Sequence, residues 1–423
     1  MTDNHAEDWF ALKGRVHNAL LERVSGLGEK QDEENIRTIC SELVKSYSHS
    51  QRGMDARAQA NLVDSLVLDT LYYGPITKLL QQDDISDIMV NGPNDVFIEK
   101  RGVKQRCPEV TFDNDEHILF LIKRIIDPLG RRCDPTSPMV DARLADGTRV
   151  NCTVFPASVD HPTITIRKFP KTAITMEALV ENGTLSKKTA AFLLACVAGG
   201  INIVVSGGTG SGKTTLLNAL SLGIPEDERV ITIEDTAELR LTSDNLVRRE
   251  ARPANTEGIG EITIHDLLVN SLRENPDRII VGECRDGAAF DMLQALNTGH
   301  DGSLTTIHAN DTFEALGRLR DLVTEAGHHL PTESIDRMIV GAIKLLVHVD
   351  RLPVQADGSR PRKVVQITEI TGYDKIIQRQ DLFLYDDTRQ SLVSTGTRPY
   401  FLDRISRNGV EIDPAWFRRV LPC

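Results

Sequence analysis

The chain contains 423 residues, which is enough for two or three domains that each have a hydrophobic core. Its composition, 40% hydrophobic and 26% charged, is ordinary for a soluble globular protein. The 61 acidic residues outnumber the 49 lysines and arginines. The resulting net charge of −12 argues against nucleic-acid binding through a basic surface that extends over the whole molecule. It leaves room for a local basic stripe.

Three further features indicate a cytoplasmic protein. The longest apolar stretch, AAFLLACVAGGINIVV, is broken by glycines and Asn202 and is too short for a membrane-spanning helix. The acidic N-terminal sequence MTDNHAEDW lacks the apolar region of a signal peptide. The seven cysteines are scattered without a C-x-x-C pair, which argues against a zinc site or a disulfide framework and for a reducing compartment.

The first elements in chain order predict a helical N-terminal module over residues 1–73. The segments ENIRTICSELVKSY and NLVDSLVLDTLYYG have apolar residues at helical spacing. Length and composition make this stretch a separate small module. The same spacing begins nearer the N-terminus with Trp9, Leu12, Val16, Leu20 and Val24.

Residues 74–170 predict a small α+β domain. The segment DISDIMVNGPNDVFIEKRG is typical of a hairpin with an Asn-Gly-Pro turn, EHILFLIKRIIDPLG of a helix, and MVDARLADGTRVNCTVF of a hairpin with an Asp-Gly turn. The strand TITIRKF follows. These strands carry Arg143, Arg149 and Arg167. From the residues alone, solvated surface arginines and ligands of a phosphoryl group are equally good interpretations of them.

A linker is expected over residues 171–185, followed by an α/β domain over residues 186–423. From residue 186 helices alternate with the short β-branched strands INIVVS, RVITIE, DRIIVGE and GSLTTIH, and this pattern predicts a doubly wound parallel sheet. After about residue 363 the sequence becomes rich in β segments such as KVVQITEITGY and DLFLYD.

The segment SGGTGSGKTT follows the first of these strands and fits the phosphate-binding pattern G-x-x-x-x-G-K-[ST]. Its glycines let successive backbone N–H groups face one anion, at the N-terminus of the helix that follows. Lys213 supplies a charge for the β- and γ-phosphates, and the Thr214 hydroxyl suits Mg²⁺. The expected ligands are a nucleoside triphosphate, ATP, and Mg²⁺. The predicted binding residues are Gly207, Gly208, Thr209, Gly210, Ser211, Gly212, Lys213, Thr214 and Thr215.

Acidic residues are expected beside this loop, because ligands of open α/β sheets collect at the carboxyl ends of the strands. Glu234 and Asp235 end and follow the strand RVITIE, where a carboxylate orders the water shell of the metal or caps a helix. In DRIIVGE, Gly282 stands where a metal-bound aspartate is usual. This leaves Glu283 to polarise the attacking water, or to pair structurally with Arg285.

A histidine completes the predicted site. His308 ends the strand GSLTTIH and is predicted to reach the γ-phosphate from the side opposite Glu283, although a lone histidine is more often structural. His300, in the turn TGHDG, is a second candidate for this role. Mg²⁺ would then be coordinated by Thr214, the nucleotide, and waters held by Glu234 and Glu283.

These segments resemble the secretion ATPases that drive type II secretion, type IV pili and type IV secretion, and most closely the CpaF-type ATPase of tight-adherence (Flp) pilus assembly. The resemblance covers nearly everything from about residue 60 to the end, and the motif DMLQALNTGHDGS-x-TTIHAN is highly specific to this group. The other matching stretches are DISDIMVNGPNDVFIEKRG, SGGTGSGKTTLLNAL, ITIEDTAEL, REARPAN, LLVNSLRENPDRIIVGECRDGAAF and STGTRPYFLDRI.

The resemblance implies a RecA-like ATPase domain, a PAS-like N-terminal domain and a ring-shaped homo-hexamer with the nucleotide in a cleft between the two domains of each subunit. It matches Glu234 to the acidic position of the aspartate box, Glu283 to an atypical Walker B segment and His308 to the histidine box. The arginines that it places in the cleft are Arg143, Arg149 and Arg167.

The resemblance also implies inner-membrane pilus or secretion platform proteins as partners, and a location at the cytoplasmic face of the inner membrane. A type IV secretion traffic ATPase is the alternative within this class. A ring-shaped P-loop nucleic-acid translocase is the alternative from another class, and the acidic balance disfavours it. A regulatory protein that does not hydrolyse nucleotide is disfavoured because Lys213, Thr214 and Glu283 are all present.

Three departures from the family pattern concern the subclass. Arg273 matches the family's Leu-Arg pair, but LRENPDR lacks the second basic residue. Cys284 stands where valine is usual. The zinc-binding cysteine module of the type II secretion ATPases is missing.

Overall fold

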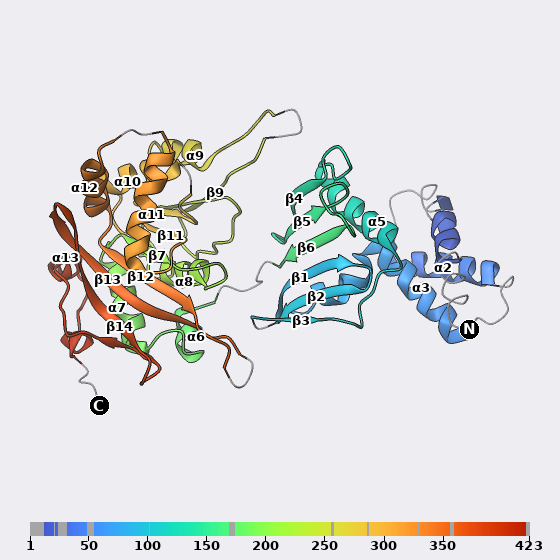
Figure 1. Cartoon of the computed structure of the whole chain (residues 1–423), viewed down its shortest axis with the longest axis horizontal. Helices are drawn as coiled ribbons and strands as arrows, with labels where there is room; N and C mark the ends of the chain where they lie inside the picture. The colour runs from blue at the N-terminus through green and yellow to red at the C-terminus, as the bar shows by residue number, and fades with distance from the viewer. Residues whose placement is uncertain are drawn as a thin grey trace. The chain divides into compact units, whose positions relative to one another are not determined.

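The computed structural model describes residues 12–20, 22–23, 32–48, 55–100, 102–144, 146–168, 174–254, 258–285, 287–327, 330–355 and 359–419. The chain divides into two compact units, unit 1 (Met1–Lys171) and unit 2 (Thr172–Cys423), and Figure 1 labels most of their helices and strands. None of the helices described is both long enough and apolar enough to cross a membrane.

Unit 1 begins with helices that pack around a core of their own. Residues 12–20 are helical, and α2 (Glu33–Ser48) and α3 (Ala56–Leu71) follow. Leu12, Val16 and Leu20 are fully buried against apolar residues of α2 and α3, as their spacing predicts. Trp9 and Val24, which belong to the same predicted pattern, lie outside the described residues.

The described remainder of unit 1 contains a six-stranded antiparallel sheet with the order β3-β2-β1-β6-β5-β4. Its helix α5 (Asp115–Ile126) is capped by the Asn114 side chain, which accepts the His117 N–H at 2.9 Å. The apolar face of α5 packs into the core of this sheet. The strands are β1 (Ile85–Gly92), β2 (Asp95–Lys100), β3 (Val103–Arg106), β4 (Met139–Arg143), β5 (Arg149–Thr153) and β6 (Thr163–Arg167). The short helices are η1 (Gly74–Ile76), α4 (Thr77–Leu80) and η2 (Asp127–Leu129).

A buried ion cluster joins the N-terminal helices of unit 1 to α5. Lys13 Nζ lies 2.8 Å from Asp69 Oδ2 and 2.6 Å from Asp113 Oδ2, and His117 lies 3.1 Å from Asp69 and 3.3 Å from Asp113. Burial opposes the charge of His117, but hydrogen bonds to Asp113 and Asp69 outweigh it and raise its pKa. Burial opposes the charges of both aspartates as well, but contacts with His117 and Lys13 outweigh it and lower their pKa values. A protonated His117 therefore balances the charges of this cluster.

Unit 2 is built on a mixed sheet that has nine strands in the described residues, in the order β15-β14-β13-β12-β7-β11-β10-β8-β9. The strands from β12 to β9 in this order run parallel, and β13, β14 and β15 are antiparallel. The four predicted strands are present as β7, β8, β10 and β11. The bounds are β7 (Ile203–Ser206), β8 (Val230–Glu234), β9 (Leu246–Glu250), β10 (Arg278–Val281), β11 (Leu304–Ile307), β12 (Leu345–Arg351), β13 (Arg362–Asp374), β14 (Ile376–Asp386) and β15 (Ser391–Ser394).

Helices cover both faces of the central sheet (Figure 1). Ile203 and Val205 of β7 pack into a core formed with α7 and α8, whereas Val204 packs into a core formed with α9, α10, α11 and α12. Because successive side chains of a strand point to opposite faces, this alternation requires apolar layers on both sides. The α/β fold class is therefore confirmed. The helices are α7 (Lys187–Ala198), α8 (Lys213–Ser221), α9 (Ile264–Ser271), α10 (Ala288–Asn297), α11 (Thr312–Glu325), α12 (Thr332–Ala342), α13 (Leu402–Arg407) and η3 (Pro414–Phe417).

The segment 171–185, for which the sequence predicts a linker, contains a helix, α6 (Met176–Glu181). Thr175 caps this helix by accepting the Ala178 N–H at 3.2 Å. Met176 and Leu179, three residues apart on one face, are buried in the core of unit 2 together with α7. From α6 onward this segment is thus part of unit 2.

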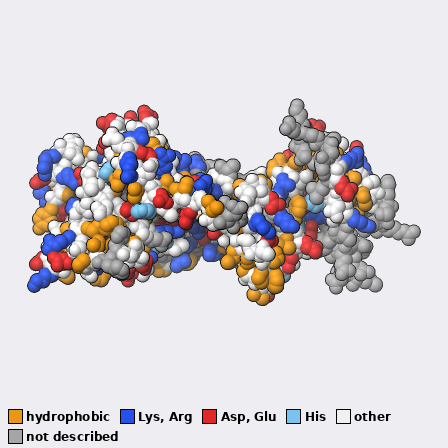
Figure 2. All heavy atoms as spheres, turned by 90° about the horizontal axis from the view of Figure 1, so that it is seen from above, with side chains coloured by type: hydrophobic (Ala, Val, Ile, Leu, Met, Phe, Trp, Pro, Cys, Tyr) orange, Lys and Arg blue, Asp and Glu red, His pale blue; other side chains and the backbone are white. Residues whose placement is uncertain are grey.

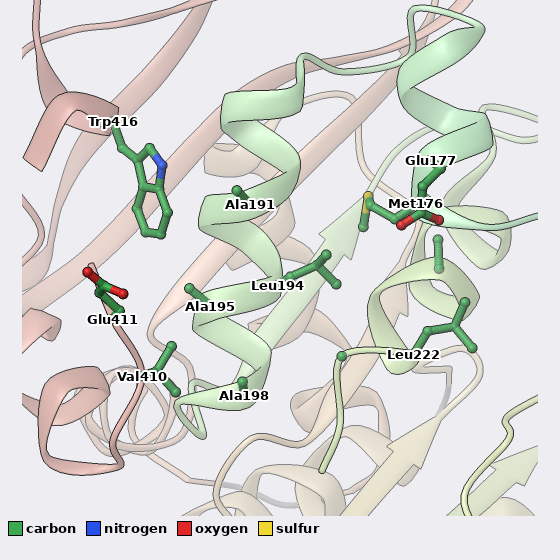
Figure 3. A pocket seen from close by; sticks show the side chains of 12 residues that line it. Met176, Glu177, Ala191, Leu194, Ala195, Ala198, Leu222, Val410, Glu411 and Trp416 are labelled. Atoms are coloured by element: carbon green, nitrogen blue, oxygen red, sulfur yellow. The ribbon is translucent and has the colours of Figure 1, made fainter. Parts of the chain in front are cut away.

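An apolar groove of about 420 Å³ lies on the outer side of α7 (Figure 3). Leu194 and small residues of α7 line it, together with the end of α8, Met176 of α6, and Val410 and Trp416 from the C-terminal segment. Nothing in the described residues shows what covers this groove. The face of the molecule in Figure 2 has basic and acidic side chains interspersed over both units.

Candidate active site

The loop between β7 and α8 has the backbone of an anion-binding loop. Gly210 and Gly212 adopt positive φ angles of 70° and 99°, which side chains rarely tolerate. A Cβ on Gly207 would lie 2.3 Å from the carbonyl oxygen of Val349, so only glycine fits there. The Ser211 N–H (3.3 Å) and the Lys213 ammonium (3.1 Å) both donate to the carbonyl oxygen of Gly208. Two donors therefore converge on one oxygen.

Lys213 connects this loop to a second strand end. Its Nζ lies 3.3 Å from Nδ1 of His308, which follows β11. Burial lowers the pKa of Lys213 to about 8, and the nearby Glu283 charge partly opposes this shift. At pH 7 the ammonium is thus mostly protonated.

His308 links Lys213 to Glu283. Its Nε2 lies 3.0 Å from Glu283 Oε1. An ammonium only donates and a carboxylate only accepts, so Nδ1 is the acceptor and Nε2 carries the proton in this chain. Burial, followed by the charge of Lys213, lowers the pKa of His308, which agrees with a neutral ring.

Glu283 has a second partner, Arg285, which also follows β10 and reaches the end of β8. Its Oε2 accepts from Nη2 of Arg285 at 2.7 Å, and Arg285 Nη1 lies 3.2 Å from Oδ2 of Asp235. The pairing with Arg285 that the sequence left open as an alternative is therefore present, alongside the contact with His308. The chain Lys213–His308–Glu283–Arg285–Asp235 joins the carboxyl ends of β7, β11, β10 and β8.

Glu234 lies in the interior beside this chain. It is 2% exposed, and its Oε1 accepts the N–H groups of Glu238 and Leu239 at 2.9 Å each. Burial raises its pKa to about 7, although these two N–H donors oppose the shift. Its Oε2 is buried without a hydrogen-bond partner among the described residues. A Cβ on Gly282 would lie 2.9 Å from Glu234 Cγ, so Glu234 explains why position 282 carries no aspartate.

The three arginines predicted for the site lie together in unit 1. Arg143 of β4 pairs with Arg149 of β5, and Arg149 pairs with Arg167 of β6, so the three form one row across neighbouring strands. Arg167 Nε also lies 3.1 Å from Oδ1 of Asp87 on β1. Like charges directly opposite in a sheet repel each other, so this row favours an anion.

His300 and Arg273 do not join the Lys213–Asp235 chain. His300 precedes β11, at the end of the strand opposite His308, and its Nδ1 lies 3.0 Å from the Ala295 carbonyl oxygen. Arg273 follows α9, and its Nη1 donates to the Val269 carbonyl at 2.8 Å. The second candidate, His300, therefore does not lie beside the phosphate loop, because the four-residue strand β11 separates it from His308.

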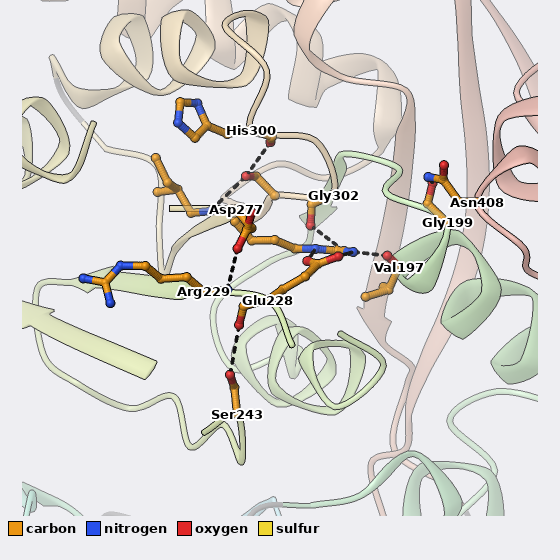
Figure 4. Close-up of polar contacts among 12 residues, drawn as sticks. Val197, Gly199, Glu228, Arg229, Ser243, Asp277, His300, Gly302 and Asn408 are labelled. Atoms are coloured by element: carbon orange, nitrogen blue, oxygen red, sulfur yellow. Dashed lines mark hydrogen bonds and ion pairs between the residues drawn. The ribbon is translucent and has the colours of Figure 1, made fainter. Parts of the chain in front are cut away.

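The TGHDG turn instead packs against the buried Arg278, and Figure 4 labels His300 and Gly302 of this turn. Arg278, 1% exposed, pairs with Glu228 at 2.9 Å and donates to the carbonyl oxygens of Gly302 and Val197. A Cβ on Gly302 would lie 2.3 Å from Arg278 Nη1. Part of this motif is therefore structural.

Three further residues lie near the phosphate loop although the sequence motifs did not indicate them. His348 is buried, with Nδ1 2.9 Å from Ser206 Oγ, and Arg362 Nε donates to the carbonyl oxygen of Gly210 at 2.9 Å. Arg351 is the cross-strand partner of Arg362. They lie more than a hundred residues after the loop, and only the accumulation of basic residues in DRLPVQADGSRPRK marked this segment.

The glycine loop and its lysine lie between a parallel strand and a helix, and acids and a histidine lie at the neighbouring strand ends. This arrangement defines a P-loop nucleotide-binding protein. Residues 70–374 match the family described as "Type II/IV secretion system protein". The chain belongs to this family.

Relatives in this family include a putative conjugal transfer protein of Mycobacterium tuberculosis, 34% identical over 66% of this chain and 80% of its own length. The type IV secretion system protein VirB11 of Bartonella quintana is 30% identical over 66% of this chain and 88% of its own length. Among solved structures, the pilus retraction motor PilT with bound ADP has a TM-score of 0.51 at 19% identity, covering 79% of this chain and 86% of PilT. The DotB ATPase of Yersinia pseudotuberculosis has a TM-score of 0.51 at 18% identity, covering 71% of this chain and 78% of DotB. These two structures share the fold.

Proposed function

We propose that this chain is an ATP-hydrolysing motor subunit of the CpaF type, which serves assembly of tight-adherence (Flp) pili. The observation that carries the proposal is the chain from Lys213 through His308 to Glu283, built on a phosphate loop in a member of the secretion ATPase family. In this proposal unit 2 is a RecA-like ATPase domain, and the sheet of unit 1 is its PAS-like N-terminal domain.

The side chains suit the hydrolysis of ATP. Lys213 and the Ser211 N–H, which now share the Gly208 carbonyl oxygen, transfer to phosphate oxygens. Lys213 then leaves His308 Nδ1, and this frees the ring to face the γ-phosphate. Glu283 remains 3.0 Å from His308 Nε2 and orients or deprotonates the attacking water.

Mg²⁺, when bound with the nucleotide, neutralises charge on the phosphates. The described residues contain no group of three or more His, Cys, Asp or Glu side chains that could hold a metal on their own. Thr214, in the first turn of α8, is the side chain proposed to bind the ion directly. Glu234 Oε2, which is buried without a partner among the described residues, fits a role in holding a metal-bound water.

We further propose that the arginine row of unit 1 (Arg143, Arg149 and Arg167) supplies positive charge to the transferred phosphoryl group when the two units close on the nucleotide. Hydrolysis would then depend on domain motion, because the site is complete only in the closed state. A homo-hexamer at the cytoplasmic face of the inner membrane would pass this motion to a platform protein. Family membership and the fold shared with the pilus retraction motor PilT support the proposal of a motor that acts on a platform protein.

A type IV secretion traffic ATPase is the second candidate, because relatives carry the names VirB11 and conjugal transfer protein. Co-purification from native cells distinguishes the two: a pilus platform protein as the main partner supports the first, and secretion-channel proteins support the second. No nucleic-acid partner is proposed. Hydrolysis that DNA stimulates in a salt-sensitive manner would instead favour a nucleic-acid translocase.

The activity itself is tested by steady-state phosphate release with ATP and Mg²⁺, comparing the parent protein with Lys213→Ala. The variant removes the ammonium that converges with the Ser211 N–H on one oxygen, so turnover should fall to background and nucleotide binding should be lost. A folded Lys213→Ala protein with parental turnover would overturn the assignment. Circular dichroism and thermal unfolding establish that the variant is folded.

A further inference from the structure

The strands β12 and β13 run along the phosphate loop from its first residue to its last glycine. β12 pairs with β7 in parallel through His348 and Ser206, then continues to Arg351 where β7 has already ended. His348 bonds to Ser206, and the Val349 carbonyl oxygen occupies the space that a side chain on Gly207 would need. The start of the loop therefore rests on β12.

Arg362, the first residue of β13, contacts the other end of the loop. It lies opposite Arg351 in the antiparallel register, and its Nε donates to the Gly210 carbonyl oxygen at 2.9 Å. A Cβ on Gly212 would lie 3.4 Å from Arg362 Cδ, and one on Gly210 would lie 3.7 Å from Arg351 Nη1. Both arginines thus lie against the glycines that have positive φ angles.

The contact at Gly210 has a consequence for the next N–H group. The Gly210 carbonyl and the Ser211 N–H belong to one planar trans peptide, so they point in opposite directions. A guanidinium that holds the carbonyl turns the N–H to the other side, where it meets the Gly208 oxygen that also accepts from Lys213. This is the position that a phosphate oxygen of a nucleotide would occupy.

We propose that Arg362 is a positioning residue for the phosphate loop, which holds the Gly210 carbonyl so that the Ser211 N–H points at the phosphate bound by Lys213. The proposal rests on nucleotide binding as proposed above. It ties the affinity of the site to the β12–β13 strand pair. Arg362 acts through the loop backbone and not on the reacting γ-phosphate.

The test replaces Arg362 with methionine, which keeps the aliphatic part of the side chain and removes the donors. The matched control is Arg360→Met, because Arg360 is an exposed arginine two residues earlier whose Nε donates to the Leu352 carbonyl at 3.3 Å. Affinities for fluorescently labelled ADP and ATP are measured by titration with Mg²⁺, and kcat and KM by phosphate release. Chemical unfolding of each variant gives its stability.

Arg362→Met should weaken the binding of ADP and ATP by the same factor, roughly fivefold for one exposed charged hydrogen bond, and raise KM with little change in kcat. Arg360→Met should leave all of these at parental values. Arg362→Lys should recover part of the affinity, because an ammonium can donate to the same carbonyl. Unfolding midpoints should match in all variants.

Three results would overturn the proposal: equal affinities for Arg362→Met and Arg360→Met, a loss confined to ATP, or a fall in kcat with unchanged affinity. The last two would indicate direct contact with the γ-phosphate. The Lys213→Ala protein separates this failure from failure of the proposed function. If Lys213→Ala loses nucleotide and Arg362→Met does not, only the role of Arg362 is wrong.

Discussion

Replacing Glu283 with glutamine removes a charge and a base while leaving the shape of the side chain almost unchanged. The carboxylate accepts from His308 Nε2 at 3.0 Å and from Arg285 Nη2 at 2.7 Å. An amide has one acceptor oxygen, so Gln satisfies only one of these donors and cannot take a proton from water. We expect turnover to fall by roughly 10²-fold or more, which corresponds to about 2.7 kcal/mol of transition-state stabilisation.

Nucleotide affinity of this variant should be nearly unchanged at pH 7, because the loop and Lys213 keep their donors. Its dependence on pH should change. The Lys213 pKa of about 8 is set mainly by burial, and the charge of Glu283 raises it. Without this charge the pKa falls, so the ammonium and the affinity are lost at a lower pH than in the parent protein.

The measurements are steady-state phosphate release and titration with labelled ADP between pH 6 and 9. Asp235→Asn is the matched control, since it removes the other carboxylate partner of Arg285, at 3.2 Å, without touching His308. Parental turnover in Glu283→Gln would remove Glu283 from the mechanism and direct attention to Glu234. Loss of binding together with turnover would indicate that Glu283 holds the metal.

Further substitutions test the other parts of the structure. Arg149→Ala and Arg143→Ala should each lower turnover by roughly tenfold or more with ADP affinity nearly unchanged, and parental turnover in both would exclude the arginine row from the reaction. Gly282→Ala brings a Cβ to 2.9 Å from Glu234 Cγ and should lower the free energy of unfolding by about 1–3 kcal/mol. Gly287→Ala is the tolerated control, because its Cβ would lie 3.5 Å from Ala326 Cβ. Equal stabilities of the two variants would contradict the packing argument. Asp69→Asn breaks the buried cluster of unit 1 and should cost about 3 kcal/mol in urea unfolding, whereas Asp64→Asn, at an exposed pair with Arg37, should cost less than about 1 kcal/mol. Because the pKa of His117 is raised, its contribution to stability is complete below its ordinary pKa and is lost as pH rises through the raised value. The decrease in the free energy of unfolding that Asp69→Asn causes should therefore be larger at pH 6 than at pH 8.

The parts of the fold and site that could be predicted from sequence depend on local backbone chemistry. The pattern from Gly207 to Thr214 requires positive φ angles and a helix start that neighbouring residues alone determine, and both are present. Short β-branched runs that are separated by helical segments predict parallel strands, and this pattern can be recognised without knowing the tertiary structure. That Glu234, Asp235, Glu283 and His308 lie at carboxyl ends followed directly from those strands.

The order of the strands across the sheet could not be predicted from the sequence. β7 lies between β11 and β12, and this order brings His308 to Lys213 across 95 positions of the chain. No local signal specifies which strand becomes the neighbour of β7, because pairing partners are selected by packing of helices on both faces of the sheet.

Register and close packing account for further features that the sequence alone could not specify. The arginine row of unit 1 exists because β4, β5 and β6 are aligned at Arg143, Arg149 and Arg167, and a shift of one residue would turn each side chain to the other face. Gly282 is a glycine because of Glu234 on another strand, and Gly302 because of Arg278. The sequence by itself determined the phosphate loop, its flanking strand and helix, and the chemical types at the strand ends, since these depend on residues adjacent in the chain. Only the tertiary structure decided that His308 faces Lys213, that His300 does not, and that Arg362 holds Gly210, because these contacts join residues whose proximity exists only after the sheet has assembled.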